Sequence, residues 1–392
     1  MYIDSHIHFT PPSMAEDLET FSELEPYWGL LITPDPVNHT VQGWATPEQM
    51  IADMDLAGID KVVLQGVYRQ TEESTRRTND DTLNILHQYQ DRVIGFAVLH
   101  FQDADRTLDE LNRCLDGGMK GVGELNPYGQ GITFDNPVFQ KVIEACIDYQ
   151  IPLNLHVSEE IGHFYLGKST TPIAEYYRVA CRYPELKLIL SHWGGGLLFY
   201  EILPEVRQNL KNVWYDTAGS PLLYPTPGIF HSALQVIDHR KLLFGSDYPL
   251  IICPSRQQQP DFRPFLGEIN SLELPQPIYD DIMGGNAARL FGLMESDDLT
   301  ETGKPDLKLT APNSIITEID KDNSPKVTPY MAVTAVCNAW PETQAVFAKY
   351  GISWQNSPVP FWEPIAQAAA AHGLGPTARK RLLEELNWSI GY

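Results

Sequence analysis

Cysteine is scarce in this chain of 392 residues. The cysteines number five, are scattered, and form no Cys-x-x-Cys pair. An odd number of isolated cysteines argues against a disulfide framework, and it is typical of reduced thiols that are mostly buried. We therefore expect a cytoplasmic protein. The cysteines are Cys114, Cys146, Cys181, Cys253 and Cys337.

Long apolar runs and positive charge are also lacking. No run of about 18 apolar residues is present, and the N-terminus lacks the pattern of a signal peptide, so we expect neither a membrane span nor a removable leader. The chain has 28 basic and 51 acidic residues, which gives a net charge of −23. Such a surface repels nucleic acid and anionic membranes, and solubility is its simplest explanation.

The N-terminal stretch Asp4-Ser5-His6-Ile7-His8 is the first feature that points to chemistry. It ends an apolar run that is typical of a short strand. Residues two apart in a strand point to the same side, so His6 and His8 can aim two imidazoles at one point. Neutral imidazole is a frequent ligand of Zn²⁺. Alone, such a pair is equally well explained by chance or by core packing.

Apolar, strand-like segments alternate with helical segments over residues 1–294. Eight such strands in this length predict an α/β fold, a (β/α)8 TIM-like barrel. A doubly wound open sheet is the alternative. It is disfavoured because polar residues gather at the ends of the first, fourth, fifth, sixth and eighth strands, and these ends converge on one face only in a barrel.

A metal site is expected on that face. Its candidate ligands are His6, His8, His156 and Asp247, with His192 beside them and Glu124 as a tentative bridge between two ions. Histidine nitrogens with a carboxylate suit Zn²⁺, which we expect, and also Mn²⁺, Fe²⁺ or Co²⁺. A bound ion would activate water, Asp247 would take its proton, and His192 would hold the substrate oxygen or shuttle a proton. A salt bridge or a hydrogen bond explains Glu124 equally well.

Five motifs in order resemble a known family. They are Asp4-Ser5-His6-Ile7-His8, Leu155-His156, Ser191-His192-Trp193-Gly194-Gly195, Phe244-Gly245-Ser246-Asp247-Tyr248-Pro249 and Gly285-Asn286-Ala287-Ala288-Arg289-Leu290-Phe291. Together they resemble the amidohydrolase superfamily, in particular the amidohydrolase 2 group that includes aminocarboxymuconate semialdehyde decarboxylase. The resemblance implies a barrel enzyme with His6, His8, His156 and Asp247 as metal ligands and His192 as an acid/base residue. Glu124 resembles the bridging glutamate of TatD-like deoxyribonucleases, which leaves one or two ions open.

Two reactions use such a set of residues, and the resemblance does not choose between them. Our first expectation is a metal-dependent hydrolase that acts on an amide, ester or lactone bond of a small, carboxylated substrate. The alternative is a non-oxidative, metal-dependent decarboxylase (carboxy-lyase) of an aromatic or enoic acid. A third hypothesis is a scaffold without catalysis, and the complete ligand set argues against it.

Other residues that follow predicted strands are candidates for substrate contacts. Arg69, after the second strand, could hold a substrate carboxylate, although solvated or ion-paired arginines are more frequent there. Residues 10–45, rich in proline and aromatic residues, form either an ordered lid or a structural excursion. The remaining candidates, with packing as the alternative, are Tyr128, His163, Trp193 and Tyr248.

The C-terminal part differs in character. Residues 295–327 are polar and predict a linker with a short strand at 314–319, and residues 328–392 predict a small all-α domain. The latter resembles the DUF1858 and ScdA N-terminal-like helical domains, which often carry cysteines after a Gly-Ile turn. Here the turn is Gly351-Ile352-Ser353-Trp354, which argues against a redox role. A stabilising appendage is the preferred explanation, docking of a partner the alternative, and the relatives imply a homodimer.

Overall fold

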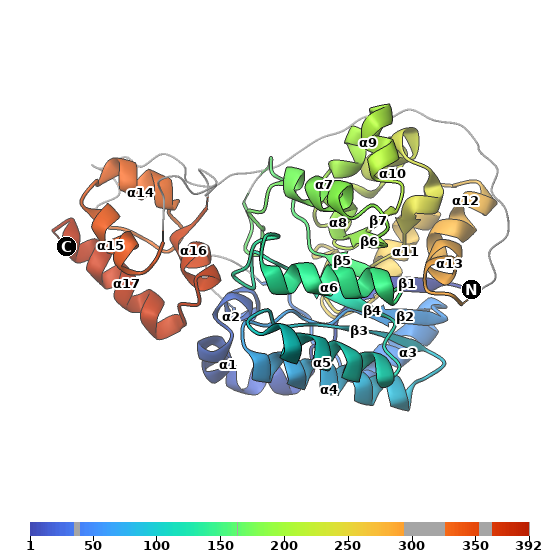
Figure 1. The fold of residues 1–392 in the computed structure, drawn as a ribbon, viewed down its shortest axis with the longest axis horizontal. Helices are drawn as coiled ribbons and strands as arrows, with labels where there is room; N and C mark the ends of the chain where they lie inside the picture. Colours follow the sequence, from blue (N-terminus) through green and yellow to red (C-terminus); the bar gives the residue numbers. More distant parts are fainter. Residues whose placement is uncertain (35–39, 163, 294–325, 353–362, 392) are drawn as a thin grey trace.

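The computed structural model describes residues 1–34, 40–162, 164–293, 326–352 and 363–391. In these residues the strands form one parallel sheet in the order of the sequence (Figure 1). Most strands are buried along their whole length, which explains their continuous apolar runs. The strands are β1 (Ile3–Ile7), β2 (Lys61–Leu64), β3 (Val93–Ala97), β4 (Gly121–Leu125), β5 (Leu153–Leu155), β6 (Leu188–Leu190), β7 (Val213–Asp216) and β8 (Leu242–Leu243).

The first and last strands close this sheet into a barrel. The backbone N–H of Ser5 donates to the carbonyl of Phe244 at 2.7 Å, and that of Asp247 donates to the carbonyl of His6 at 2.9 Å. The predicted (β/α)8 barrel is therefore confirmed. Because all strands are parallel, their carboxyl ends meet at one face, where the candidate ligands lie.

Helices connect the strands and cover the outside of the barrel (Figure 1). The 3-10 helices η2 (Leu197–Ile202) and η3 (His239–Lys241) and the π-helix η4 (Asp281–Gly285) complete the connections. The helices are α3 (Pro47–Ala57), α4 (Glu72–Gln88), α5 (Ala104–Asp116), α6 (Pro137–Asp148), α7 (Ile173–Arg182), α8 (Ser191–Gly194), α9 (Pro204–Asn209), α10 (Thr226–Val236), α11 (Arg263–Asn270), α12 (Gln276–Asp280) and α13 (Asn286–Leu290).

Helix α3 illustrates how local sequence sets these boundaries. The Thr46 hydroxyl accepts from the backbone N–H of Gln49 at 3.2 Å, Pro47 occupies the first position, and Gly58 ends the helix with a φ of 71°. The Gln49 side chain differs from a capping box, because its amide donates to Asp53 at 2.7 Å instead of returning to the cap.

The segment of residues 10–45 contains helices that the sequence did not predict. These are η1 (Pro12–Asp17), α1 (Leu18–Leu24) and α2 (Pro26–Ile32). Pro26 suggests a loop, yet it stands at the first position of α2, where a missing N–H costs nothing. The Tyr27 hydroxyl donates to the carbonyl of Gly167 at 3.2 Å, and the Trp28 ring packs on Tyr68 at 5.4 Å. Helix α2 is therefore an ordered cover over the loops that follow β2 and β5.

A C-terminal helical module has its own apolar core and docks on this cover. Figure 1 places it on the side of the barrel away from the N-terminus, with α16 packed against α2. The Gln367 amide donates to the carbonyl of Lys168 at 2.6 Å and accepts from the backbone N–H of Gly167 at 3.2 Å. The strand predicted at 314–319 lies outside the described residues. The module consists of α14 (Val333–Ala339), α15 (Thr343–Lys349), α16 (Ile365–Ala371) and α17 (Pro376–Ser389).

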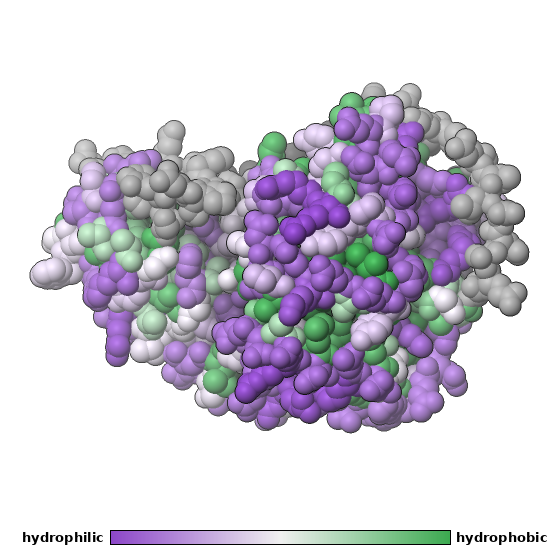
Figure 2. All heavy atoms as spheres, in the orientation of Figure 1, coloured by the Kyte–Doolittle hydropathy of each residue, from purple (hydrophilic) through white to green (hydrophobic). Residues whose placement is uncertain are grey.

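The surface and the described helices agree with the composition. Figure 2 shows hydrophilic residues over most of the visible face. No helix in the described part of the chain has the length and apolar character needed to cross a membrane. Four of the five cysteines are buried and all five are free, with Cys181 exposed.

Glu363, at the start of the module's contact with the barrel, gives a testable pH dependence. It is 3% exposed, accepts from the Tyr128 hydroxyl, and burial raises its pKa from 4.5 to about 8. The folded state therefore binds this proton more tightly than the unfolded state, and stability falls as the pH rises from about 4.5 to 8. At pH 9 we expect Glu363→Gln to unfold at a higher urea concentration than the wild type, with a free energy of unfolding that is larger by at most about 4–5 kcal/mol. At pH 4.5 we expect the two proteins to unfold at similar urea concentrations.

The matched control for Glu363 is Glu384→Gln, an exposed glutamate of α17 in the same module. We expect the control to follow the wild-type pH profile. Parallel profiles for wild type and Glu363→Gln would contradict the assignment of a protonated, buried carboxyl at this contact.

Candidate metal centre

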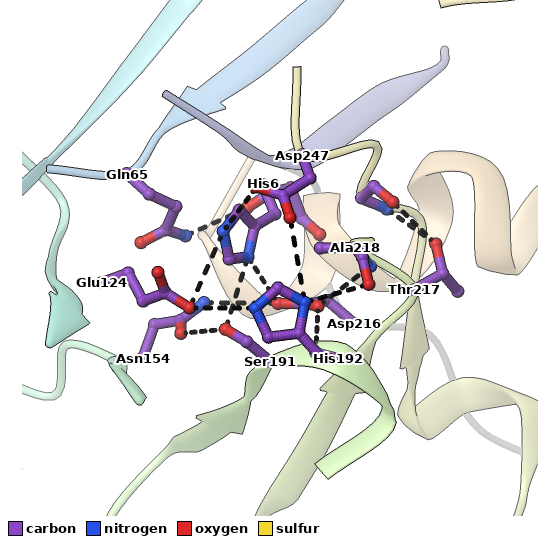
Figure 3. A network of polar contacts seen from close by, with 12 residues as sticks. His6, Gln65, Glu124, Asn154, Ser191, His192, Asp216, Thr217, Ala218 and Asp247 are labelled. Carbon is purple, nitrogen blue, oxygen red and sulfur yellow. Dashed lines mark hydrogen bonds and ion pairs between the residues drawn. The ribbon is translucent and has the colours of Figure 1, made fainter. Parts of the chain in front are cut away.

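Three strands, β1, β4 and β8, bring a first group of histidines and carboxylates together at the carboxyl face of the barrel (Figure 3). His6, in β1, and His8, directly after this strand, place their Nε2 atoms 3.1 Å apart. Asp247, after β8, lies with Oδ1 3.4 Å from His8 Nε2 and 3.8 Å from His6 Nε2. Glu124, in β4, approaches the same two nitrogens at 3.7 and 3.9 Å. All four side chains are buried.

The outer nitrogens of His6 and His8 fix how the two rings are protonated. His6 Nδ1 lies 2.9 Å from Asp216 Oδ2, and His8 Nδ1 lies 3.2 Å from the carbonyl oxygen of Gln65. Both partners are acceptors, so both Nδ1 atoms carry hydrogen, and the Nε2 atom of each ring presents a lone pair when that ring is neutral. Two lone pairs 3.1 Å apart repel unless a cation or a proton lies between them. This donor set, with each ring held from behind by an acceptor, fits a divalent metal ion.

A second group of side chains adjoins the first through Glu124. Its Oε1 lies 3.1 Å from His156 Nδ1 and 3.4 Å from His192 Nε2. His192 Nδ1 donates to the carbonyl of Ala218 at 3.0 Å, which turns Nε2 toward the cluster. The ligand atoms of His6, His8 and Glu124 lie within 4.8 Å of one another, and so do those of Glu124, His156 and His192. Glu124 thus stands where a bridging ligand would, and its bridging role stays a prediction.

The pKa values of these side chains reflect a dense, buried charge cluster. Burial lowers the pKa of His6, but Asp216 and Glu124 outweigh it and raise the value to about 10. Burial lowers the pKa of His192 as well, and Glu124 and Asp247 together raise it to about 9. Burial raises the pKa of Glu124, yet His156 and His6 hold it well below its usual range. Glu124 is therefore ionised, and the pocket favours positive charge.

Backbone geometry aims two of these residues. His192 and Asp247 adopt φ angles of 55° and 65°, which lie in the left-handed region that residues other than glycine rarely occupy. Such strain is concentrated at functional sites. Gly245 lies so close to β1 that a Cβ atom there would stand 2.8 Å from the Cβ of His6. The absence of a side chain at Gly245 therefore leaves space for His6.

Asp216 is the functional residue that sequence reasoning missed. It ends β7, and besides His6 it accepts from the backbone N–H of His192 at 2.9 Å. The signal was present, because Asp216 ends a predicted strand just as the chosen residues do. Asp4 was not assigned a role either. Its Oδ1 accepts from the backbone N–H groups of His6 and Ser246 at 3.0 and 3.1 Å, which ties β1 to the loop after β8.

The residues predicted to contact the substrate lie in different surroundings. The indole N–H of Trp193 donates to Ser220 at 2.7 Å, and the Tyr248 hydroxyl donates to Asp53 at 2.7 Å, so the polar atoms of these two side chains are engaged outside the cluster. Tyr128 contacts Glu363 of the module. Arg69 is buried and lines a cavity together with Gln65, whose carbonyl orients His8. His163 lies outside the described residues.

Asp216 offers a direct test of the metal centre. Asp216→Asn retains the shape of the side chain but removes the negative charge that orients His6 and raises its basicity. Such changes behind a ligand typically cost about 10- to 100-fold in metal affinity, and we expect a loss of this size for Mn²⁺, measured by competition with a chelating dye. Asp281→Asn is the control, because Asp281 holds His239 at 3.0 Å away from the cluster. Equal affinities in all three proteins would contradict the assignment.

Comparison with known proteins identifies relatives of this barrel. The sequence profile of the amidohydrolase family matches residues 3–293. Gamma-resorcylate decarboxylase from Rhizobium sp. is 27% identical over 244 residues, which cover 50% of this chain and 74% of that protein. The 2-amino-3-carboxymuconate-6-semialdehyde decarboxylase of Dictyostelium discoideum is 22% identical over 279 residues, covering 62% and 74%.

A solved structure supports the same fold. Dihydroxybenzoic acid decarboxylase from Polaromonas sp., with bound manganese and the inhibitor 2-nitroresorcinol, superposes with a TM-score of 0.55 at 19% identity. The match covers 75% of this chain and 98% of that one. The resemblance of the C-terminal helices to DUF1858 and ScdA-like domains stays a prediction, and so does zinc.

These relatives overturn the first functional expectation. Hydrolysis of an amide, ester or lactone was wrong as the preferred reaction, because the curated relatives are decarboxylases. The physical reason for the error is that both reactions use histidine and aspartate ligands at the same strand ends. The ligand motifs identify the kind of site but carry no information on the bond that is broken.

Proposed function

The chain belongs to the amidohydrolase family, and from this premise we propose that it is a metal-dependent, non-oxidative decarboxylase of an aromatic or enoic carboxylic acid. The observation that carries the proposal is the agreement of the two curated relatives, both decarboxylases of such acids, over the barrel that holds the cluster. The donor set supports a divalent cation. Manganese in the Polaromonas decarboxylase supports Mn²⁺ as the ion to test first.

The residues proposed to hold the cation are those whose free atoms converge. They are His6 and His8 through Nε2 and Asp247 through a carboxylate oxygen, with His156 and Glu124 adjoining them. When bound, a divalent cation supplies Lewis acidity, which holds anionic oxygens of the substrate and stabilises negative charge as CO₂ departs. The partial burial of the site keeps these interactions strong, because water screens them less.

In the proposed reaction the bond between the carboxylate and its carbon breaks, and the electron pair stays on that carbon. One proton then replaces the lost CO₂. We propose His192 as the residue that delivers this proton, because its Nδ1 is held by the Ala218 carbonyl while Nε2 faces the cluster. Asp247, whose Oδ2 lies 3.9 Å from His192 Nδ1, stabilises the protonated ring.

The experiment is a test of three acids with the manganese-loaded protein in D₂O. The acids are 2,6-dihydroxybenzoate, 5-carboxyvanillate and a 2-amino-3-carboxymuconate semialdehyde. A decarboxylase releases CO₂ and leaves a product with one deuterium at the carbon that carried the carboxylate. No CO₂ from any of these acids or from further ring and enoic acids, together with hydrolysis of an ester panel, would contradict the proposal.

A further inference from the structure

The loop after β5 lies between the metal centre and the C-terminal module. We call residues 157–162 and 164–172 the β5 loop. These described residues contain no helix or strand, so contacts with other elements fix the position of the loop. The loop begins directly after His156, whose side chain adjoins Glu124 and His192 in the cluster. The way in which the loop is held therefore affects the orientation of His156.

The two ring nitrogens of His156 have different surroundings. Nδ1 lies 3.1 Å from Glu124 Oε1 and 3.1 Å from His192 Nε2, so it is the nitrogen that faces the cluster. Nε2 lies 3.3 Å from the hydroxyl oxygen of Ser158, in the β5 loop. An imidazole that binds a cation through Nδ1 carries its hydrogen on Nε2 and donates it to an acceptor behind the ring. Ser158 is placed to be that acceptor.

Ser158 is itself held by the far end of the β5 loop. Its hydroxyl oxygen accepts from the backbone N–H of Ser169 at 2.9 Å, and both serines are buried. This N–H belongs to the same peptide unit as the carbonyl group of Lys168. A peptide unit is planar, so whatever fixes the direction of the carbonyl also fixes the direction of the N–H. We call this unit the 168–169 peptide.

Gln367 of α16 bonds to the other side of the 168–169 peptide. Its amide nitrogen donates to the carbonyl oxygen of Lys168 at 2.6 Å, and its amide oxygen accepts from the backbone N–H of Gly167 at 3.2 Å. Gln367 is fully buried and is the one polar residue of α16, whose sequence is IAQAAAA. An apolar side chain could dock this helix without the cost of burying an amide. The contribution of the glutamine is therefore its two bonds to the β5 loop.

We propose that Gln367 and Ser158 are positioning residues for His156, so that the C-terminal module supports the metal centre of the barrel. This inference rests on the proposed function, because it requires a cation at the cluster. Gln367 holds the 168–169 peptide, the peptide orients the Ser158 hydroxyl, and the hydroxyl fixes the ring of His156. The match to the family profile ends at residue 293, so this support comes from outside the family's barrel.

The test measures the affinity of the full-length protein for Mn²⁺ by competition with a chelating dye. Ser158→Ala removes the acceptor behind His156 and should weaken binding by about tenfold or more. Gln367→Met keeps the length of the side chain but removes both of its bonds to the β5 loop. It should weaken binding about two- to tenfold, because fewer molecules hold the loop in the position that binds the cation.

A double variant distinguishes positioning from two unrelated defects. Once Ser158→Ala has removed the hydroxyl, the module has no hydroxyl left to position. In that background Gln367→Met should therefore weaken Mn²⁺ binding by less than about twofold more. Independent effects would instead multiply, and multiplied losses would overturn the proposed linkage between the two residues.

Thr377→Val is the matched control. It removes a different bond between the module and the barrel, from the Thr377 hydroxyl to Glu23 of α1 at 2.6 Å. The control should bind Mn²⁺ as the wild type does, and melting temperatures establish that each variant is folded. A loss of affinity in Thr377→Val equal to that in Gln367→Met would assign the effect to docking of the module as a whole, and would overturn the role of Gln367.

Failure of this inference and failure of the proposed function give different results. CO₂ release with unchanged Mn²⁺ affinity in both Ser158→Ala and Gln367→Met would overturn the positioning role and leave the decarboxylase proposal standing. Weaker binding in both variants, without CO₂ release from any acid by the loaded wild type, would retain the positioning role and remove the decarboxylase. A wild type that binds no Mn²⁺ would overturn both.

Discussion

Alanine in place of His8 is expected to empty the metal site and to reduce CO₂ release by at least about 10³-fold. His8 contributes one of the two Nε2 lone pairs that face each other at 3.1 Å, and alanine leaves only one imidazole at that point. Its loss breaks a single bond to the Gln65 carbonyl, so the barrel should remain folded. His6 is less suitable for this test, because its removal would leave Asp216 buried without its partner.

The measurement for His8→Ala is manganese per chain by elemental analysis, together with CO₂ release from the best acid. His87→Ala is the control, because His87 is an exposed histidine of α4. We expect full metal content and full activity in the control. A His8→Ala protein that retains manganese and turns over normally would show that β1 does not build the site.

Asparagine in place of His192 is expected to separate catalysis from metal binding. Asparagine can still donate to the Ala218 carbonyl, but it cannot carry a proton to the reacting carbon. Loss of a general acid typically costs about 10²- to 10⁴-fold in rate, and we expect kcat to fall in this range. Manganese content should change little, because the converging atoms of His6, His8 and Asp247 remain.

The pH profile distinguishes proton transfer from a structural role of His192. A residue that only supports the site would change KM or metal content and leave the shape of the profile of kcat unchanged. A proton donor leaves a titration step in this profile, and the step should disappear in His192→Asn. Turnover at the wild-type rate, with an unchanged profile, would assign the proton to another group.

Much of the fold followed from the sequence because the barrel repeats one simple signal. Buried parallel strands produce continuous apolar runs, and the residue after each run lies at the carboxyl face. His6, His156, His192 and Asp247 could be placed in this way. Helices α1 and α2 could not, because they are only seven residues long and rich in features typical of loops. Their stability comes from packing on Tyr68 and on the C-terminal module, which local sequence does not reveal.

The sequence predicted the site only through residues that lie at the ends of strands. Asp216 was missed because it belongs to no motif, and its role depends on facing His6 across the barrel. Trp193 and Tyr248 follow strands as the ligands do, yet their polar atoms turn to Ser220 and Asp53. Position after a strand thus predicts a residue's face of the barrel but not the direction of its side chain.

The sequence motifs could not identify the reaction, and the reason is chemical. The same histidines and aspartate serve hydrolysis and decarboxylation, and the difference lies in what the pocket holds and where a proton is delivered. In this chain one such feature is His192, whose ring is turned by the Ala218 carbonyl. It requires the folded structure to be recognised.

CO₂ release by one protein preparation, measured before and after loading with manganese, shows whether decarboxylation depends on the bound metal. The protein is stripped with a chelator, assayed with the three acids, reloaded with Mn²⁺ and assayed again. We predict release that is absent from the stripped protein, returns in proportion to bound manganese, and does not return in His8→Ala. Equal release with and without bound metal, or no release by fully loaded protein from any ring or enoic acid, would contradict the account.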